Sequence, residues 1–224
     1  DLVFDYTKKY RLANYFKPDI KKALMIGGGA FTFPRDFLIR NPKSTIDVVE
    51  IDPKLIELSK IYFNFKIDPR LKIINEDGRT FLNKNTASYD AIYLDAFRSL
   101  VPPYQLTTKE ALQSIFSHLS DDGVVMVNII SSFKGAKSQF LKAQYTTYKQ
   151  YFPNVYLISD GYREPEKAQN IMLIALKSNK IFNFKSENAE FNNYLNNKYN
   201  EDMPISFVLT DDYAPVENLM ANVY

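Results

Sequence analysis

The sequence predicts an α/β fold: a Rossmann-like domain in which a doubly wound, mostly parallel sheet is covered by helices. Short apolar runs rich in β-branched residues alternate with stretches of helical periodicity, as in parallel strands joined by crossover helices. The first run ends in Gly27, Gly28 and Gly29, three of the seven glycines in the chain. The second run ends near Glu50, about twenty residues later, a spacing typical of the nucleoside-binding half of such a sheet.

Size and composition indicate one folded unit. The chain has 224 residues, of which 46% are hydrophobic and 15% aromatic, so it is long enough for a full core. We expect a single domain over 1–224, with 1–18 as an N-terminal helix and 178–224 as a C-terminal extension. The chain begins at Asp1 rather than at methionine, which favours 1–18 as the remnant of a longer protein.

Charge and rare residue types exclude several classes of function. The net charge is +2 and the basic residues are scattered among acids, so we expect no nucleic-acid partner. With no cysteine and one histidine, the chain is expected to have no disulfide and no metal site. No apolar run approaches the roughly 18 residues of a membrane span, and no signal peptide is visible. We expect a cytoplasmic protein, or a soluble domain of a membrane-anchored one.

The first half of the chain is expected to supply four strands. Residues 2–16 form an amphipathic pattern, which predicts a helix that ends before Pro18. Strands are predicted over the apolar runs 23–26, 45–51, 71–74 and 89–94. Helices are predicted at 32–40, at 53–63 with Pro53 in its first turn, and over a short stretch ending at 82.

The second half is expected to complete the sheet with a hairpin. A loop over 96–106 leads to Thr107 and Glu110, whose spacing fits a capping box for a helix that ends at 119. The remaining predicted elements are a strand at 124–130, a helix at 136–151, an antiparallel edge hairpin of 155–158 with 171–176, a polar helix or loop at 183–200, and a short strand at 204–209.

The glycine turn is the first part of a candidate ligand site. Glycines at 27–29 let backbone approach a ligand without a Cβ in the way, although a tight turn without ligand has the same pattern. Thr32 stands where a dinucleotide motif has its third glycine, so phosphates are not required. A phosphate-free adenosyl ligand, such as S-adenosylmethionine or its decarboxylated form, suits the site.

Acidic residues at the next strand ends extend this site. We favour Glu50 as the acceptor for both ribose hydroxyls over Asp52, which precedes Pro53 and is typical of a helix N-cap. Asp77 and Gly78 follow the third strand. Asp77 is placed either to accept a hydrogen bond from an adenine amino group or to cap the helix that follows.

Two further acidic segments are candidates for substrate chemistry. Asp95 ends the fourth strand, where a carboxylate accepts a proton from an amine nucleophile, holds a cationic substrate, or caps the strand end. The segment 210–217 forms either a plain turn or a negative wall for a substrate. Its candidate substrate-binding residues are Asp211, Asp212, Tyr213 and Glu217.

Five segments, in this order, resemble the spermidine synthase-like family. They are LMIGGGAFTFPR (24–35), VVEIDP (48–53), DPRLKIINEDGRTFL (68–82), YDAIYLDAF (89–97) and LTDDYAPVE (209–217). The resemblance spans most of the chain and implies a fold of the class I methyltransferase and spermidine synthase type. It also implies that Glu50 binds the ribose, that Asp77 binds the adenine, and that Asp95 matches the catalytic acid of true polyamine synthases.

Two positions depart from the pattern of that family. Ala30 stands where true spermidine synthases have an acid that holds the aminopropyl ammonium. Arg98 stands where they have an acid that grips the diamine, and a cation there would repel a diamine. The family's small N-terminal β domain is not part of this sequence.

These observations predict a transferase that binds S-adenosylmethionine or a close analogue. The reaction we expect first is methyl transfer to an unknown small-molecule acceptor, with an amine among the candidates. One alternative is an aminopropyltransferase of polyamine biosynthesis that uses decarboxylated S-adenosylmethionine. Another is a non-catalytic ligand-sensing or assembly domain of a longer protein. A homodimer is one possible assembly.

Overall fold

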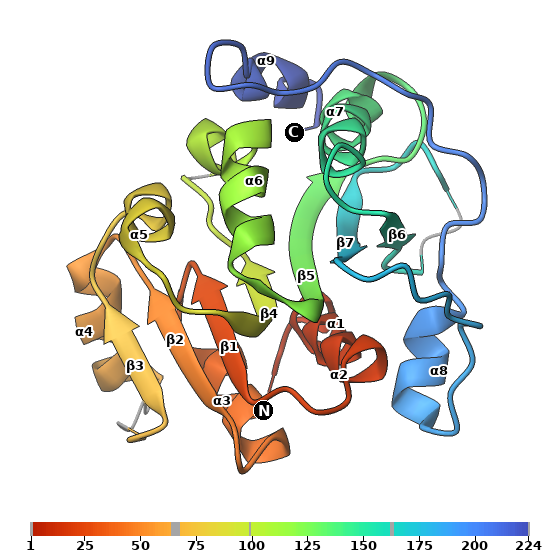
Figure 1. Ribbon diagram of the computed structural model, residues 1–224. Coiled ribbons are helices and arrows are strands. Elements are labelled where there is room, and N and C mark those ends of the chain that lie inside the picture. The colour runs from red at the N-terminus through yellow and green to blue at the C-terminus, as the bar shows by residue number, and fades with distance from the viewer. Residues whose placement is uncertain (1, 64–67, 99, 162–163, 224) are drawn as a thin grey trace.

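A sheet of seven strands forms the centre of the part of the chain that the structure describes (Figure 1). This computed structural model describes residues 2–63, 68–98, 100–161 and 164–223. The strands are β1 Lys22–Ile26, β2 Thr45–Val49, β3 Leu71–Ile74, β4 Tyr89–Leu94, β5 Leu119–Ser131, β6 Asn154–Ile158 and β7 Gln169–Leu176. They lie in the order β3-β2-β1-β4-β5-β7-β6. The strands from β3 to β5 are parallel, whereas β7 is antiparallel to both β5 and β6, which confirms the predicted edge hairpin.

The connection of the strands creates a switch point between β1 and β4. The strands β2 and β3 extend the sheet on one side of β1, and the chain then returns to place β4 and β5 on the other side. In open α/β sheets, a ligand crevice forms at such a point, outside the carboxyl ends of the strands. The topology therefore predicts a ligand crevice among the loops that follow β1, β2, β3 and β4.

Helices cover both faces of this sheet (Figure 1). One face carries α5 Gly78–Lys84, α6 Lys109–Ser117, α7 Gln139–Tyr148 and α9 Val216–Met220. The other carries α1 Asp5–Lys9, α2 Ala13–Phe16, α3 Thr32–Arg40, α4 Pro53–Tyr62 and α8 Ala189–Leu195. Short 3₁₀ turns lie at Tyr10–Leu12, Tyr104–Leu106 and Ala136–Ser138.

Each strand contributes to two cores, one on each face. In β1, Leu24 and Ile26 pack on the side of α5, α6 and α7, whereas Ala23 and Met25 pack on the side of α3. All four are at most 3% exposed. Successive side chains of a strand point to opposite faces, so a strand covered on both faces is apolar at every position. This is why β1 appears in the sequence as an uninterrupted apolar run.

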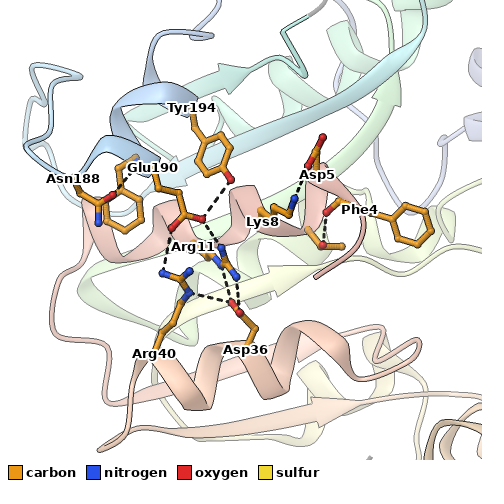
Figure 2. Close-up of polar contacts among 11 residues, drawn as sticks. Phe4, Asp5, Lys8, Arg11, Asp36, Arg40, Asn188, Glu190 and Tyr194 are labelled. Atoms are coloured by element: carbon orange, nitrogen blue, oxygen red, sulfur yellow. Dashed lines mark hydrogen bonds and ion pairs between the residues drawn. The ribbon is translucent and has the colours of Figure 1, made fainter. Parts of the chain in front are cut away.

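An ion cluster joins the 3₁₀ turn Tyr10–Leu12 to α3 and to α8 (Figure 2). We call Arg11, Asp36, Arg40 and Glu190 the Arg11 cluster. Arg11 donates two hydrogen bonds to Asp36, at 2.8 and 2.6 Å, and also pairs with Glu190. Arg40 lies 3.2 Å from Glu190 and 3.5 Å from Asp36. These carboxylates raise the pKa of the Arg11 guanidinium further above its usual value.

Two predicted features in the second half are wrong. The N-cap of α6 is Thr108, which accepts from the Ala111 N–H at 3.3 Å, whereas the Thr107 hydroxyl donates to the Tyr104 carbonyl. Glu110 does not complete a capping box, because its carboxylate accepts from the Asp211 N–H. The described residues 204–209 form no strand. Instead, the Leu209 N–H donates to the Thr147 hydroxyl of α7.

Candidate functional site

A cavity of about 890 Å³ lies at the carboxyl ends of the strands around the switch point. It is lined by residues that follow β1, β2, β3 and β4, by the segment 101–106, and by Ala214, Val216 and Glu217 at and just before the start of α9. This volume is within the range of small-molecule sites, which is roughly 300–1,000 Å³. The cavity lies at the edge of the sheet where the sequence placed the candidate site.

The glycine turn allows the ends of β1 and β4 to approach each other. Gly27 has a φ of +92°, and a Cβ there would lie 2.5 Å from the carbonyl oxygen of Asp95. The Asp95 N–H in turn donates to the Ile26 carbonyl at 3.0 Å. Gly27 and Gly29 line the cavity, whereas Gly28 lies behind it, where a Cβ would be 2.8 Å from the ring of Phe31. Substitution at Gly27 would therefore displace Asp95 as well as strain the turn.

Glu50 lies at the end of β2 and holds this turn. One carboxylate oxygen, Oε2, accepts from the Gly28 N–H at 2.8 Å and from the Gly29 N–H at 3.2 Å. The other, Oε1, accepts from the Asp52 N–H at 3.0 Å. Asp52 itself caps α4 by accepting from the Lys54 N–H, as predicted. Glu50 is 5% exposed and lines the cavity, so it has the position expected of a ribose-binding acid.

The sequence left two roles open for Asp77, helix cap and ligand acceptor, and its place in the structure is compatible with both. Its Oδ1 accepts from the Thr80 N–H at 2.9 Å and caps α5. The same residue lines the cavity, and its Oδ2 has no hydrogen-bond partner among the described residues. Gly78 also lines the cavity, and a Cβ there would lie 2.5 Å from the Ile26 side chain. Capping therefore leaves one oxygen of Asp77 for a ligand.

Asp95 follows β4 and is half-buried at the wall of the cavity. Burial raises the pKa of its carboxyl group to about 6, against hydrogen bonds from Asn128, Tyr10 and Tyr6 that lower the pKa. The Asn128 amide donates to Asp95 Oδ1 at 3.3 Å. No partner of Asp95 among the described residues is a cation. A carboxylate with this pKa is a stronger base than a solvated one and stays largely ionised at neutral pH.

Three neighbours of Asp95 were not identified as site residues from the sequence. Tyr6 on α1 and Tyr10 in the following 3₁₀ turn lie within the amphipathic stretch 2–16, which predicted only a helix. Burial and then the charge of Asp95 raise the pKa of Tyr6 to about 12, so its hydroxyl stays a donor. Asn128 is 6% exposed in the middle of β5. A buried polar side chain in a strand of β-branched residues requires a polar partner. The single asparagine in this apolar run was therefore the sequence signal that could have identified Asn128 as a site residue.

The loop 209–217 contributes less to the cavity than expected. Asp211 accepts from the Thr108 hydroxyl at 2.6 Å and pairs with Arg79 at 2.8 Å, so it ties the loop to α5 and α6. Asp212 and Tyr213 are exposed. None of these three residues lines the cavity, whereas Glu217 does. Of the four substrate-binding candidates in this loop, Glu217 therefore has the position that the prediction requires.

The part of the chain that the structure describes contains no group of three or more histidine, cysteine, aspartate or glutamate side chains that could hold a metal ion. None of its helices is long and apolar enough to cross a membrane.

The switch-point topology and its cavity define a Rossmann-like domain of the methyltransferase and spermidine synthase type. Residues 10–188 match the model of the spermine/spermidine synthase domain, so the chain belongs to that family. It is 29% identical over 221 residues to a probable polyamine aminopropyl transferase of Bifidobacterium longum, covering 88% of this chain and 48% of that protein. It is 26% identical over 178 residues to a polyamine aminopropyltransferase of Vibrio vulnificus, covering 78% and 56%.

A solved structure agrees with this membership. The crystal structure of a probable spermidine synthase from Corynebacterium glutamicum superimposes with a TM-score of 0.73 at 25% identity, over 84% of this chain and 68% of that one. The chain spans about half the length of the curated relatives described above. Those relatives are described as aminopropyltransferases. Their descriptions name aminopropyl transfer, the alternative given above, and not methyl transfer, the reaction expected first.

Proposed function

We propose that this domain transfers the aminopropyl group of decarboxylated S-adenosylmethionine to a small-molecule amine. One observation carries the proposal: Asp95 is a half-buried carboxylate with a pKa raised to about 6, beside the glycine turn of a spermine/spermidine synthase domain. An aliphatic amine is protonated near neutral pH and must lose a proton before or during attack. A base of raised pKa in contact with the cavity suits that task.

The reaction is a displacement at the carbon bonded to the sulfonium sulfur. The lone pair of the acceptor nitrogen forms the new N–C bond. The C–S bond breaks, and methylthioadenosine leaves with its electron pair. The proton lost by the nitrogen passes to the Asp95 carboxylate. Positioning of the two substrates supplies most of the rate, and a general base adds about 10²–10⁴-fold.

The adenosyl end of the donor is assigned to Glu50 and Asp77. A carboxylate has about four lone-pair positions, and Glu50 uses three of them for the N–H groups of Gly28, Gly29 and Asp52. One position is free, and the Gly29 bond at 3.2 Å is the longest and the easiest to exchange. This count supports binding of two ribose hydroxyls to Glu50. The unbonded Oδ2 of Asp77 supports its role as an acceptor for the adenine amino group.

Two measurements test the proposed function. Calorimetry with S-adenosylmethionine, its decarboxylated form and methylthioadenosine reports which donor binds. Incubation of each donor with a panel of amines, followed by mass spectrometry, reports which group is transferred. We expect amine-dependent release of methylthioadenosine from the decarboxylated donor, with the aminopropyl group on the acceptor.

The matched control is Asp90, an aspartate within β4. Asp90 lies at the opposite end of the strand, where its carboxylate accepts from the N–H groups of Lys21 and Lys22 at 2.8 and 3.1 Å. We expect Asp95→Asn to lose transfer and Asp90→Asn to keep it per mole of folded protein. Release of S-adenosylhomocysteine instead would establish methyl transfer. Binding without any release would establish a ligand-sensing domain.

A further inference from the structure

Seven charged residues line the cavity, and two of them have side chains that make no hydrogen bond or ion pair with the described residues. Five acids are held by the protein. Glu50, Asp52 and Asp77 accept backbone N–H bonds, Glu76 pairs with Lys84 at 2.7 Å, and Asp95 accepts from Asn128 and two tyrosines. The two without a partner are Glu217 and Arg98. They carry opposite charges, so the cavity offers a ligand one unpaired cation and one unpaired anion, in addition to the acceptor positions left at Glu50 and Asp77.

Arg98 is fixed at its backbone and free at its guanidinium. Its N–H donates to the Val101 carbonyl at 2.8 Å, and the Val101 N–H donates back at 3.3 Å. Pro102 and Pro103 follow and also line the cavity, and their rings restrict φ. Asp95 and Arg98 are therefore three positions apart on one short segment, and both residues line the cavity. The Arg98 residue is exposed, so its guanidinium is accessible to a ligand.

The surroundings of Arg98 decide which anion it takes. A guanidinium binds carboxylates and phosphates in a two-pronged geometry. A phosphate would carry up to two negative charges into a cavity lined by six carboxylates. The N–H groups of Gly28 and Gly29, which would hold a phosphate at the glycine turn, already donate to Glu50. A single carboxylate is the anion that fits this balance of charge.

We propose that Arg98 binds a carboxylate carried by one of the two substrates, so that the cavity takes an amino acid-type acceptor or donor and disfavours a plain diamine. A diamine brings two positive charges, and the second would meet the Arg98 guanidinium. An amino acid-type substrate brings one ammonium for Asp95 or Glu217 and one carboxylate for Arg98. This inference rests on the proposed function only in taking the cavity as the place of transfer.

The carboxylate has two sources, and matched pairs of ligands distinguish them. Ornithine differs from putrescine, and lysine from cadaverine, by one carboxylate on the acceptor. S-adenosylmethionine differs from its decarboxylated form by one carboxylate on the donor. Acceptor binding is measured by calorimetry on the complete chain saturated with methylthioadenosine, which cannot react. Donor binding is measured on the chain without other ligands.

Variants at position 98 test whether the preference for a carboxylate-bearing ligand depends on the Arg98 guanidinium. In the wild type we expect the carboxylate-bearing member of at least one pair to bind about 10- to 100-fold more tightly, the range of a hydrogen-bonded charge. Arg98→Ala should remove that preference, Arg98→Lys should keep part of it, and Arg98→Asp should reverse it toward the diamine. Arg35→Ala removes an arginine outside the cavity lining and should keep the wild-type preference.

The outcomes separate this inference from the proposed function. The inference is overturned if the wild type binds the ligands without carboxylate equally well or better in every pair, or if the preference survives in Arg98→Ala. A carboxylate preference on the donor supports the inference and contradicts transfer from the decarboxylated donor. A carboxylate preference without transfer from any donor supports the inference and contradicts the proposed function. Transfer to plain diamines with no effect of Arg98→Ala supports the function and overturns the inference.

Discussion

The cavity and the Arg11 cluster contain the same kinds of charged side chain in opposite arrangements. In the Arg11 cluster, both arginines contact both carboxylates, and the longest of the measured contacts is 3.5 Å (Figure 2). In the cavity, Asp95 is held by neutral donors, and Arg98 has no side-chain partner among the described residues. Charges that meet each other stabilise the fold. Charges that meet only neutral groups remain available to a ligand.

The pKa shifts follow this difference. In the Arg11 cluster, hydrogen bonds from Asp36 and Glu190 raise the pKa of Arg11 and so favour its charged form. In the cavity, burial raises the pKa of Asp95 and so disfavours its charged form. The protein therefore carries an energetic cost at Asp95 that it avoids at Arg11. Ionisable groups with such a cost are concentrated at functional sites.

The largest expected effect is at Asp95. Asp95→Asn keeps the shape and much of the hydrogen bonding but removes the charge and the base. Turnover with an amine acceptor should fall by about 10²–10⁴-fold, whereas donor affinity measured by calorimetry should stay within about threefold. A variant that loses thermal stability, with activity lost only in proportion, would instead identify Asp95 as a structural cap and remove the contrast between the two regions.

The next effect is at Glu50. Glu50→Ala should weaken the binding of methylthioadenosine by about 1.5–3 kcal/mol, or about 10- to 150-fold, because hydrogen bonds to a charged group are lost. The control is Asp47→Ala on the same strand, since Asp47 accepts from the Tyr89 hydroxyl at 2.8 Å and does not line the cavity. It should lower the melting temperature without changing affinity. Unchanged affinity in a folded Glu50→Ala protein would contradict the ribose assignment.

The sequence was sufficient for most elements because their signals are local. The predicted ranges of α3, β3 and β4 agree with the structure to within a residue. Each of the two strands is a short apolar run bounded by polar residues. The two wrong predictions, the capping box of α6 and the strand at 204–209, arose where the local sequence fits more than one structure. Thr107 and Thr108 are adjacent candidates for one cap, and the apolar residues of 204–209 pack beside α7 without strand pairing.

The site was predictable where it depends on strand ends and not where it depends on packing. Gly27, Glu50, Asp77 and Asp95 follow successive strands and therefore converge at one edge of the sheet. Tyr6 reaches Asp95 from a helix 89 positions earlier in the chain, which no local pattern reports. Asp211 looked like a substrate residue because its partner, Arg79, is 132 positions away.

The pH dependence of turnover is a smaller expected effect, and it tests the role assigned to Asp95 in the cavity. The Asp95 carboxylate acts as base in its ionised form, so kcat/KM should fall about tenfold per pH unit below an apparent pKa of about 6. The sign for stability is opposite. Since the folded-state pKa is raised, the contribution of Asp95 to stability is present at low pH and is lost as pH rises through about 6. Asp95→Asn should abolish both dependences; an acid limb that persists in this variant belongs to another group.

The smallest expected effect, that of Arg11→Ala, distinguishes most directly between the Arg11 cluster and the cavity. Arg11→Ala leaves Asp36 and Glu190 partly buried, with Arg40 as their remaining partner in the cluster. The variant should lose about 1–2 kcal/mol of stability, more than an exposed ion pair provides, which corresponds to a melting temperature lower by roughly 2–8 °C for a chain of this size. Affinity for methylthioadenosine should stay within about twofold of the wild type, because the Arg11 cluster lies outside the cavity lining.

The control for this variant is another basic residue of the same helical segment. Lys8 pairs with Asp5 at 2.7 Å, but the Asp5 side chain is 81% exposed, so Lys8→Ala should change stability by less than about 0.5 kcal/mol. Urea unfolding of both variants, with and without methylthioadenosine, measures stability and affinity in one experiment. If Arg11→Ala weakened ligand binding as much as Glu50→Ala, the paired charges of the Arg11 cluster would be part of the binding machinery. The separation of stabilising from ligand-binding charges would then fail.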